Sequence, residues 1–310
     1  MHGRIIAAFM LMLAASCWTG CTPETMATAT PAAGLGEGEA LVLGDISDEA
    51  AETIAGTQPL ADYLAARLTE HGIARGRVRI APDLSTMVRL VESGEVDVYF
   101  DSPYPVLIVS RKTGAKPILR RQKYGVAEYH SVFFTRADTG LSSLADLQGQ
   151  MVAFEEAFST SGYMLPLAHL LEAGMNPVEK SSPVVTVAAD EVGYVFSTAD
   201  NTTIQWVISG RVPVGVIDNV TFSRLPADTQ SELAIVAETE AVPRQMVLVR
   251  PGLDPALVEA IETELLAMDE SEAGQAVLDT FLTSEFDEFP QGATPALGRM
   301  EALYELAKER

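Results

Sequence analysis

The chain has 310 residues, of which 47% are hydrophobic and 21% are charged, and its formal net charge at pH 7 is −22. This balance is typical of a globular protein, and the length is sufficient for one large α/β unit or for two lobes. The 43 Asp and Glu residues outnumber the 21 Lys and Arg residues, which argues against binding to nucleic acid. A small anion in a local site of backbone N–H groups is still compatible with this charge.

The first residues have the pattern of a signal peptide. Arg4 precedes an apolar run at residues 5–15, which is too short for a good transmembrane span. The only two cysteines, Cys17 and Cys21, follow this run, and a disulfide between them would stabilise nothing. We therefore expect a lipoprotein signal, with Cys21 as the lipidated residue and Cys17 as the competing site. Plain secretion is the alternative.

These expectations divide the N-terminal part of the chain. Residues 1–21 are predicted to be the signal peptide, and residues 22–40, which are rich in Thr, Pro, Ala and Gly, a flexible tether. The remaining chain has no cysteine, so its fold depends on its hydrophobic core. The expected location is periplasmic, anchored to the membrane by the lipid.

From residue 40 onward, apolar strand patterns alternate with helical patterns, which predicts an α/β architecture with mainly parallel sheets. Strands are predicted at 40–46, 77–82, 96–100, 115–122, 129–138, from 151, 184–188, 212–219, 233–239 and 244–250. Helices are predicted at 59–73, 85–95, 142–147, from about 160 to 173, at 201–211, 255–268, 271–282 and 295–308.

Residues 159–162, Ser-Thr-Ser-Gly, stand where a helix is predicted to begin. One hydroxyl, from Ser159 or Thr160, is enough to cap the helix. The other hydroxyls and the free N–H groups then form a cluster of donors at the positive end of the helix dipole, and Gly162 permits close approach of a ligand. Such a cluster suits a tetrahedral oxyanion. An ordinary helix cap is the alternative interpretation.

The segment "YHSVFFTRADTGLSSLADLQGQMVAFEEAFSTSGYMLPLAHLLEAG", with "QPLADYL", "GEVDVYFDSPYPV" and "SGRVPVGVIDN", closely resembles the periplasmic binding proteins of phosphate, phosphite and phosphonate ABC importers. The resemblance covers nearly all of residues 41–289. It implies a type II periplasmic binding fold, in which the ligand lies between two lobes joined by two crossover segments that act as a hinge. Lobe 1 would comprise residues 41–135 and 240–310, and lobe 2 residues 136–239, with the crossovers near Thr135 and Thr239.

The same resemblance implies a function. Ser159, Thr160, Ser161 and Gly162 would bind the oxyanion, and an ABC permease would receive it. A monomer without catalytic residues, cofactor or metal is expected. A sensor module that reports the ligand to a membrane kinase is an alternative, and an enzyme on the same scaffold is another.

The rest of the expected pocket departs from the family pattern. Relatives that bind aminoalkylphosphonates have tyrosines in lobe 1 and a histidine in lobe 2, whereas this chain has Leu84, Asp101 and Asp200 at those positions. Tyr104 is a possible substitute for a tyrosine. The oxyanion therefore remains open among phosphonate, phosphite and phosphate.

Asp101, Asp200 and Asp218 are the acidic candidates for ligand contact. Asp101 and Asp218 end predicted strands, and ligands of open α/β sheets lie beyond the carboxyl ends of strands. A carboxylate beside an anion is unfavourable unless it accepts a proton from the anion or meets a cation. A P–OH group or a ligand ammonium group would satisfy this condition. The alternative for each residue is that it caps a turn or a helix.

Overall fold

The computed structural model describes residues 39–308. The predicted signal peptide and both cysteines lie outside the described residues, as does the predicted tether except for residues 39 and 40, which belong to the first strand. In the described range, no helix has the length and the apolar character needed to cross a membrane.

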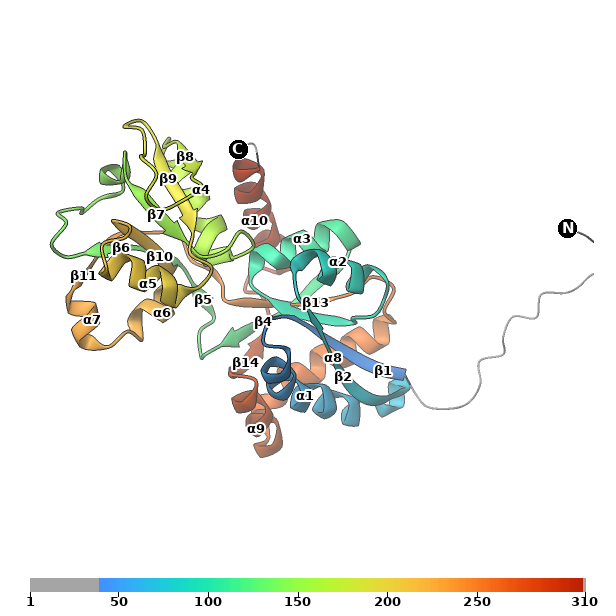
Figure 1. The fold of residues 1–310 in the computed structure, drawn as a ribbon. Coiled ribbons are helices and arrows are strands. Elements are labelled where there is room, and N and C mark those ends of the chain that lie inside the picture. The colour runs from blue at the N-terminus through green and yellow to red at the C-terminus, as the bar shows by residue number, and fades with distance from the viewer. Residues whose placement is uncertain (1–38, 309–310) are drawn as a thin grey trace, which may run out of the picture. The chain divides into compact units, whose positions relative to one another are not determined.

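The first of two six-stranded sheets has the strand order β14-β4-β13-β3-β1-β2 (Figure 1). Its strands are β1 (Glu39–Ile46), β2 (Ile73–Ala81), β3 (Val98–Asp101), β4 (Lys116–Lys123), β13 (Gln245–Val249) and β14 (Thr283–Asp287). The helices connected to them are α1 (Ala50–Arg67), α2 (Leu84–Glu92), α3 (Pro103–Thr113), α8 (Pro255–Leu266) and α9 (Glu272–Thr280), with the 3-10 turns η1 (Thr69–His71) and η4 (Met268–Glu270).

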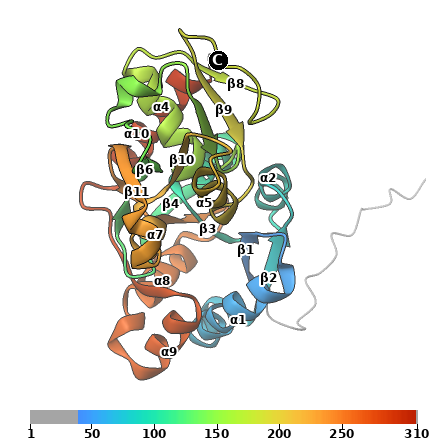
Figure 2. The same ribbon diagram turned by 60° about the vertical axis from the view of Figure 1, so that its left-hand side comes forward.

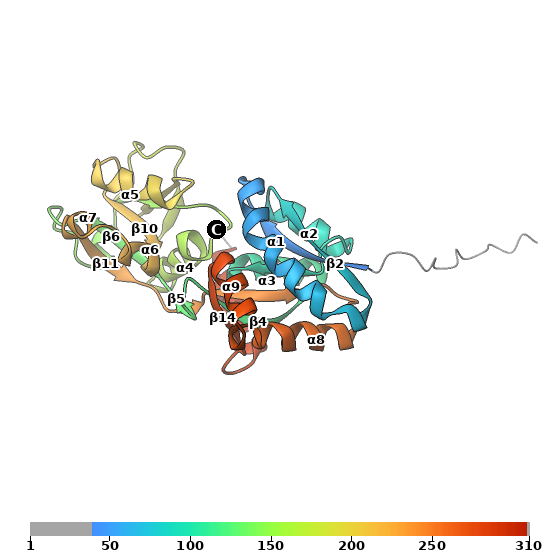
Figure 3. The same cartoon turned by 90° about the horizontal axis from the view of Figure 1, so that it is seen from below.

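Side chains of the first sheet alternate between two buried cores, as the period of two in a strand requires. Leu41 and Leu43 of β1 pack in the core under α1 and α8, whereas Val42 packs in the core under α2 and α3. Tyr99 of β3 and Leu248 of β13 also belong to this second core. Helices therefore cover both faces of the sheet, as Figure 3 shows from below.

The second sheet has the strand order β11-β6-β10-β7-β9-β8. Its strands are β6 (Ser131–Arg136), β7 (Met151–Phe154), β8 (Pro177–Glu179), β9 (Val192–Phe196), β10 (Val214–Asp218) and β11 (Leu233–Glu238). The helices among them are α4 (Leu165–Glu172), α5 (Asp200–Ile208), α6 (Asn219–Ser223) and α7 (Ala227–Ser231), with the 3-10 turn η2 (Leu144–Leu147) and the π-helical turn η3 (Thr160–Met164).

The last helix, α10 (Ala293–Ala307), packs on the core of the second sheet. Met300 and Leu303 of α10 lie in that core together with Leu167 and Leu170 of α4. The expected division placed residues 240–310 entirely with the first sheet. α10 contacts α3, which belongs to the first sheet, as well as α4, and Figure 2 shows α10 beside α4. This helix therefore packs on the elements of both sheets.

Two segments connect the sheets, and each contains a short strand. β5 (Glu128–Tyr129) follows β4, and β12 (Val242–Pro243) follows β11, and the two pair in antiparallel fashion. The chain therefore crosses between the sheets near residues 124–130 and 239–244. The first crossover lies earlier than the expected position near Thr135, because residues 131–135 already pair with β10 and β11 in the second sheet.

Two sequence predictions are corrected by the strand pairing. The first sheet is mixed, because β13 and β14 pair antiparallel with their neighbours after the chain has returned from the second sheet. No strand forms at residues 184–188, where Val184 is 81% exposed. The edge strand of the second sheet is β8, which lies directly after α4.

Candidate ligand-binding site

The Ser-Thr-Ser-Gly segment begins the helix after β7, as predicted. Ser159 is the N-cap of η3, and its Oγ accepts a hydrogen bond of 2.9 Å from the N–H of Gly162. The first turn is π-helical, since the N–H of Met164 donates to the carbonyl of Ser159 at 3.0 Å. Single π-helical turns widen the helix and are frequent at functional sites. Ser161 is fixed by the Ser131 hydroxyl, which donates to its carbonyl at 2.7 Å.

Gly162 is required by the close approach of a neighbouring side chain. A Cβ atom at this position would lie 2.4 Å from the Cβ and 2.6 Å from the Oε2 of Glu155, and 2.9 Å from the Oγ of Ser159. The Glu155 carboxylate therefore lies directly against the backbone of this turn.

A pocket of about 200 Å³ opens beside this turn. Its walls come from the first sheet and helix α3, from the β5 crossover, from the segment around the turn, and from the strand ends of the second sheet. The lining residues are Asp101, Ser102, Pro105, Tyr129, Glu155, Glu156, Phe158, Ser159, Ser161, Asp200, Asp218, Arg244 and Gln245.

Two residues predicted to bind the ligand have other contacts. The Thr160 hydroxyl donates to the Oγ of Ser102 and accepts from the N–H of Tyr104, both at 2.9 Å. The Tyr104 ring lies 6.1 Å from the ring of Tyr304 in α10 and does not line the pocket. Burial raises the pKa of Tyr104 to about 12. The Tyr104 ring therefore packs against α10, and a ligand contact by this residue stays a prediction.

Asp101 and Asp218 line the pocket, but their carboxylates already accept several hydrogen bonds. Asp101 accepts from the Tyr99 hydroxyl and, at 2.6 Å, from the N–H of Ser102. Asp218 is the N-cap of α6 and accepts from the N–H groups of Val220 and Thr221 at 2.9 and 3.0 Å. The capping role considered for Asp218 is therefore present in addition to its position in the pocket.

Asp200 lies at the start of α5 and lines the same pocket. Burial raises the pKa of Asp200 to about 8, and the charges of Glu155 and Asp218 add to this effect. Arg244 and a hydrogen bond with Thr221 oppose the increase. Its environment therefore favours the protonated carboxyl over the carboxylate.

Glu155 is not among the candidates named from the sequence. Glu155 lines the pocket, and burial raises the pKa of its carboxyl, with a further increase from Asp218. The Ser159 hydroxyl and Arg244 act in the opposite direction. A signal was present in the sequence, since Glu155 directly follows the end of a buried strand.

Arg244 and Tyr129 were also missed. Both lie at the crossovers, and the Arg244 guanidinium lies 4.4 Å from the ring centroid of Tyr129. Arg244 Nε is buried and has no hydrogen-bond partner. Within residues 39–308, every other buried side-chain nitrogen or oxygen has one. The Tyr129 hydroxyl bonds to the side chains of Thr160 and Ser161. A cation beside a predicted hinge is the pattern that would have identified Arg244.

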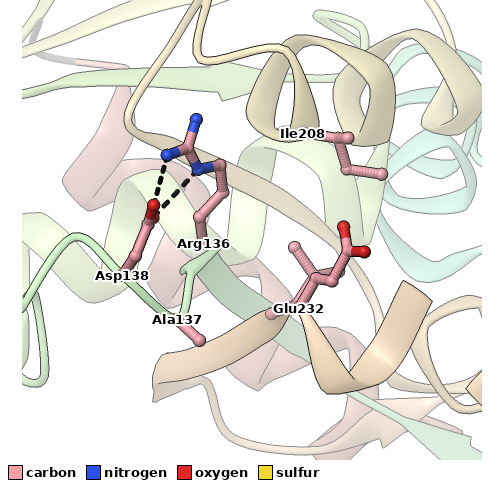
Figure 4. A pocket seen from close by; sticks show the side chains of 6 residues that line it. Arg136, Ala137, Asp138, Ile208 and Glu232 are labelled. Carbon is pink, nitrogen blue, oxygen red and sulfur yellow. Dashed lines mark hydrogen bonds and ion pairs between the residues drawn. The ribbon is translucent and has the colours of Figure 1, made fainter. Parts of the chain in front are cut away.

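Another hollow, of about 370 Å³, lies at the end of β6, away from the Ser-Thr-Ser-Gly turn (Figure 4). Its arginine is already paired, since Arg136 Nε donates to Asp138 at 3.0 Å. The arginine of this hollow is therefore already paired with a carboxylate. Over the described range, no cluster of three or more His, Cys, Asp or Glu residues is arranged to hold a metal ion.

The chain is similar to known proteins in sequence and in fold. Residues 44–291 match the family described as ABC transporter, phosphonate, periplasmic substrate-binding protein. The chain belongs to this family. Family members are transport proteins that bind substrate and are not enzymes, in agreement with the sequence prediction.

The structure of XAC2383 from Xanthomonas citri, solved with chloride, is similar with a TM-score of 0.82 and 30% identity, covering 87% of this chain and 98% of that one. The same protein has also been solved with ATP. PhnD1 from Prochlorococcus marinus, solved with methylphosphonate, has a TM-score of 0.66 and 16% identity over 87% of this chain and 98% of its own. These neighbours confirm the type II periplasmic binding fold.

Among curated proteins, the phosphate-import protein PhnD of Mycolicibacterium smegmatis is 24% identical over 192 residues. The match covers 59% of this chain and 58% of that relative, which is less than two thirds of its length.

Proposed function

We propose that this protein is the substrate-binding subunit of an ABC importer and that it captures a phosphorus oxyanion, which it delivers to a permease. We further propose that lipid on Cys21 anchors it at the periplasmic face of a membrane, with Cys17 as the alternative. Each sheet forms the centre of one lobe in this proposal, the two crossovers form the hinge, and α10 contacts both lobes. Ligand binding favours the closed state, which the permease recognises.

The observation that carries this proposal is the set of unsatisfied and hydroxylic donors around one pocket. Ser159, Ser161 and Tyr129 bring hydroxyls, and Arg244 brings a buried Nε that lacks a partner. A buried donor without a partner costs free energy, so a ligand that accepts from it gains affinity. Arginine suits phosphorus oxyanions because its planar fork matches two oxygens at once.

The relatives support the same chemical class. One is a phosphate importer by name, another was solved with methylphosphonate, and XAC2383 was solved with chloride and with ATP. All of these ligands are anions, and most contain phosphorus bonded to oxygen. Members of one family can differ in substrate, so the ligand has to be measured for this chain.

The proposal is tested by thermal denaturation of the full chain in detergent with phosphate, phosphite, methylphosphonate, 2-aminoethylphosphonate, ATP or sulfate. A ligand at about 100 times its Kd adds roughly 2.7 kcal/mol to the free energy of unfolding, which raises the Tm by several degrees. We expect at least one phosphorus oxyanion to do this. An unchanged Tm with every ligand would contradict the proposed substrate class.

A further inference from the structure

Five acids line the pocket, and four of them, Asp101, Glu155, Asp200 and Asp218, differ in how far protein donors satisfy them. Asp218 accepts from two backbone N–H groups and from the Thr221 hydroxyl, the last at 2.7 Å. Asp101 accepts from a backbone N–H and from two hydroxyls. Glu155 instead has the neighbouring Ser159 hydroxyl, and Asp200 lies near the Thr221 hydroxyl, which already donates to Asp218. Of these four acids, Glu155 and Asp200 therefore have acceptor capacity left for a ligand or a proton.

The position of Glu155 decides which part of a ligand it meets. Its carboxylate lies against Gly162 and bonds to the Ser159 hydroxyl, within the turn that carries the oxyanion donors. A ligand ammonium group separated from phosphorus by a carbon chain would lie farther from this turn. An oxyanion bound to these donors would therefore have its own oxygens nearest Glu155.

The charges around this pair do not favour two carboxylates beside an anion. Asp218, Asp101 and Glu156 also line the pocket, whereas Arg244 is the basic residue among its walls, and Tyr129 is neutral. Like charges that share a buried site force at least one of them to take up a proton. Burial and mutual repulsion raise the pKa of both Glu155 and Asp200, in agreement with this placement.

We propose that Glu155 and Asp200 share a proton with the bound oxyanion, so that the site takes oxyanions bearing P–OH and rejects sulfate, which brings no such proton. This inference rests on the proposed function and names the form in which the substrate is bound. The complex then holds one proton more than the fully ionised pocket and ligand together. The proton comes from the P–OH group of the ligand or from solvent, and no covalent bond changes.

The experiment measures the Kd of phosphite, phosphate and 2-aminoethylphosphonate from pH 6 to pH 9 by calorimetry, for the wild type, Glu155→Gln and Asp200→Asn. The free ligand ionises identically in every titration, so a difference between proteins in the slope of log Kd against pH reports a difference in the protons taken up on binding. Asp190→Asn is the control, because it removes one negative charge at an exposed position of the second sheet's connections. Sulfate is titrated into each protein at pH 7.

In the wild type we expect the Kd to rise by up to about tenfold per pH unit more than in Glu155→Gln, because one bound proton gives that slope. Asp200→Asn should also show a weaker dependence of Kd on pH, and Asp190→Asn should show the same dependence as the wild type. Glu155→Gln should bind sulfate measurably, since its amide donates without needing a proton.

Equal slopes in the wild type and in both pocket variants would overturn the inference while leaving oxyanion binding intact. Preferential binding of 2-aminoethylphosphonate that weakens as the pH falls would also overturn it, because the acids would then act as ionised partners of an ammonium group. If none of the phosphorus oxyanions binds the wild type at any pH, both the inference and the proposed function fail.

Discussion

The N–H of Tyr104 donates a hydrogen bond of 2.9 Å to the Oγ1 of Thr160. Tyr104 lies in the first turn of α3, which follows a strand of the first sheet, and Thr160 begins the π-helical turn that follows a strand of the second sheet. This bond therefore joins the two groups of elements immediately beside the pocket. Thr160 therefore links the pocket walls, and the ligand contact expected of it from sequence stays a prediction.

Thr160→Val tests this role. The substitution removes the acceptor for Tyr104 and the donor to Ser102, each worth about 1 kcal/mol. We expect the ligand to dissociate roughly 5- to 30-fold faster, with a smaller change in the association rate, because the closed pocket is less stable. Thr160→Ser keeps the hydroxyl and should behave as the wild type in stopped-flow kinetics. Equal dissociation rates for both variants would contradict this assignment.

Arg244→Gln tests the cation of the pocket. The variant removes the charge and the buried Nε, and we expect the Kd for the oxyanion to rise by roughly 100-fold or more. Arg224→Gln is the matched control, because Arg224 also stacks on Tyr124 but is exposed and lies outside the pocket walls. Calorimetric titration compares the two. A loss of affinity of the same size in Arg224→Gln would mean that overall charge matters instead of this contact.

Gly162→Ala tests the close packing of the turn. The new methyl group would overlap Glu155 and Ser159, at 2.4–2.9 Å, so the turn or the carboxylate must move. We expect oxyanion binding to fall by at least tenfold, with a lower Tm. Gly56→Ala is the control. Gly56 lies within α1, and an added Cβ would be 3.9 Å from its nearest neighbour, the Thr280 carbonyl oxygen, so this change should leave binding unchanged and stabilise the helix slightly. Wild-type affinity in Gly162→Ala would contradict the packing described.

The stability of the unliganded protein should decrease as the pH rises from 5 to 8. Burial raises the pKa of Asp200 to about 8, above its value of 3.8 in a model peptide, so the unfolded chain ionises first. The stability present below the unfolded pKa is therefore lost as the pH approaches the folded pKa. Asp45, with a pKa raised by burial to about 6, contributes in the same direction.

Asp200→Asn should reduce this pH dependence and should be more stable than the wild type at pH 8. Denaturant unfolding at several pH values gives both results. If the wild type and Asp200→Asn lose stability in parallel between pH 5 and pH 8, Asp200 does not cause this pH dependence.

The sequence predicted the fold class and the helix-capping turn because these depend on local patterns. Ser159 caps its helix since a hydroxyl at that position satisfies an N–H three residues on, wherever the rest of the chain lies. The burial of Glu155 could not be predicted in this way, because it depends on pocket walls from other elements, which include Asp200 at the start of α5 and Asp218 at the end of β10. The packing of α10 on the second sheet likewise depends on a contact between elements more than one hundred residues apart.

Arg244 illustrates the same limit. A single arginine after a proline gives no periodic signal, and its role arises only when the two crossovers bring it against Tyr129. The packing of the Tyr104 ring is a similar case, because its neighbour Tyr304 lies on a helix far along the chain.

The most direct test of the central claim is a calorimetric titration of phosphite, or of whichever phosphorus oxyanion stabilises the protein most, into the wild type and Ser161→Ala. Ser161 lines the pocket, and a hydrogen bond to a charged group is worth about 1.5–3 kcal/mol. We predict that the Kd rises by roughly 10- to 100-fold in Ser161→Ala. The control Ser209→Ala, which removes an exposed hydroxyl bonded to the Trp206 carbonyl, should match the wild type. An unchanged Kd in Ser161→Ala would contradict the claim that this turn binds the oxyanion.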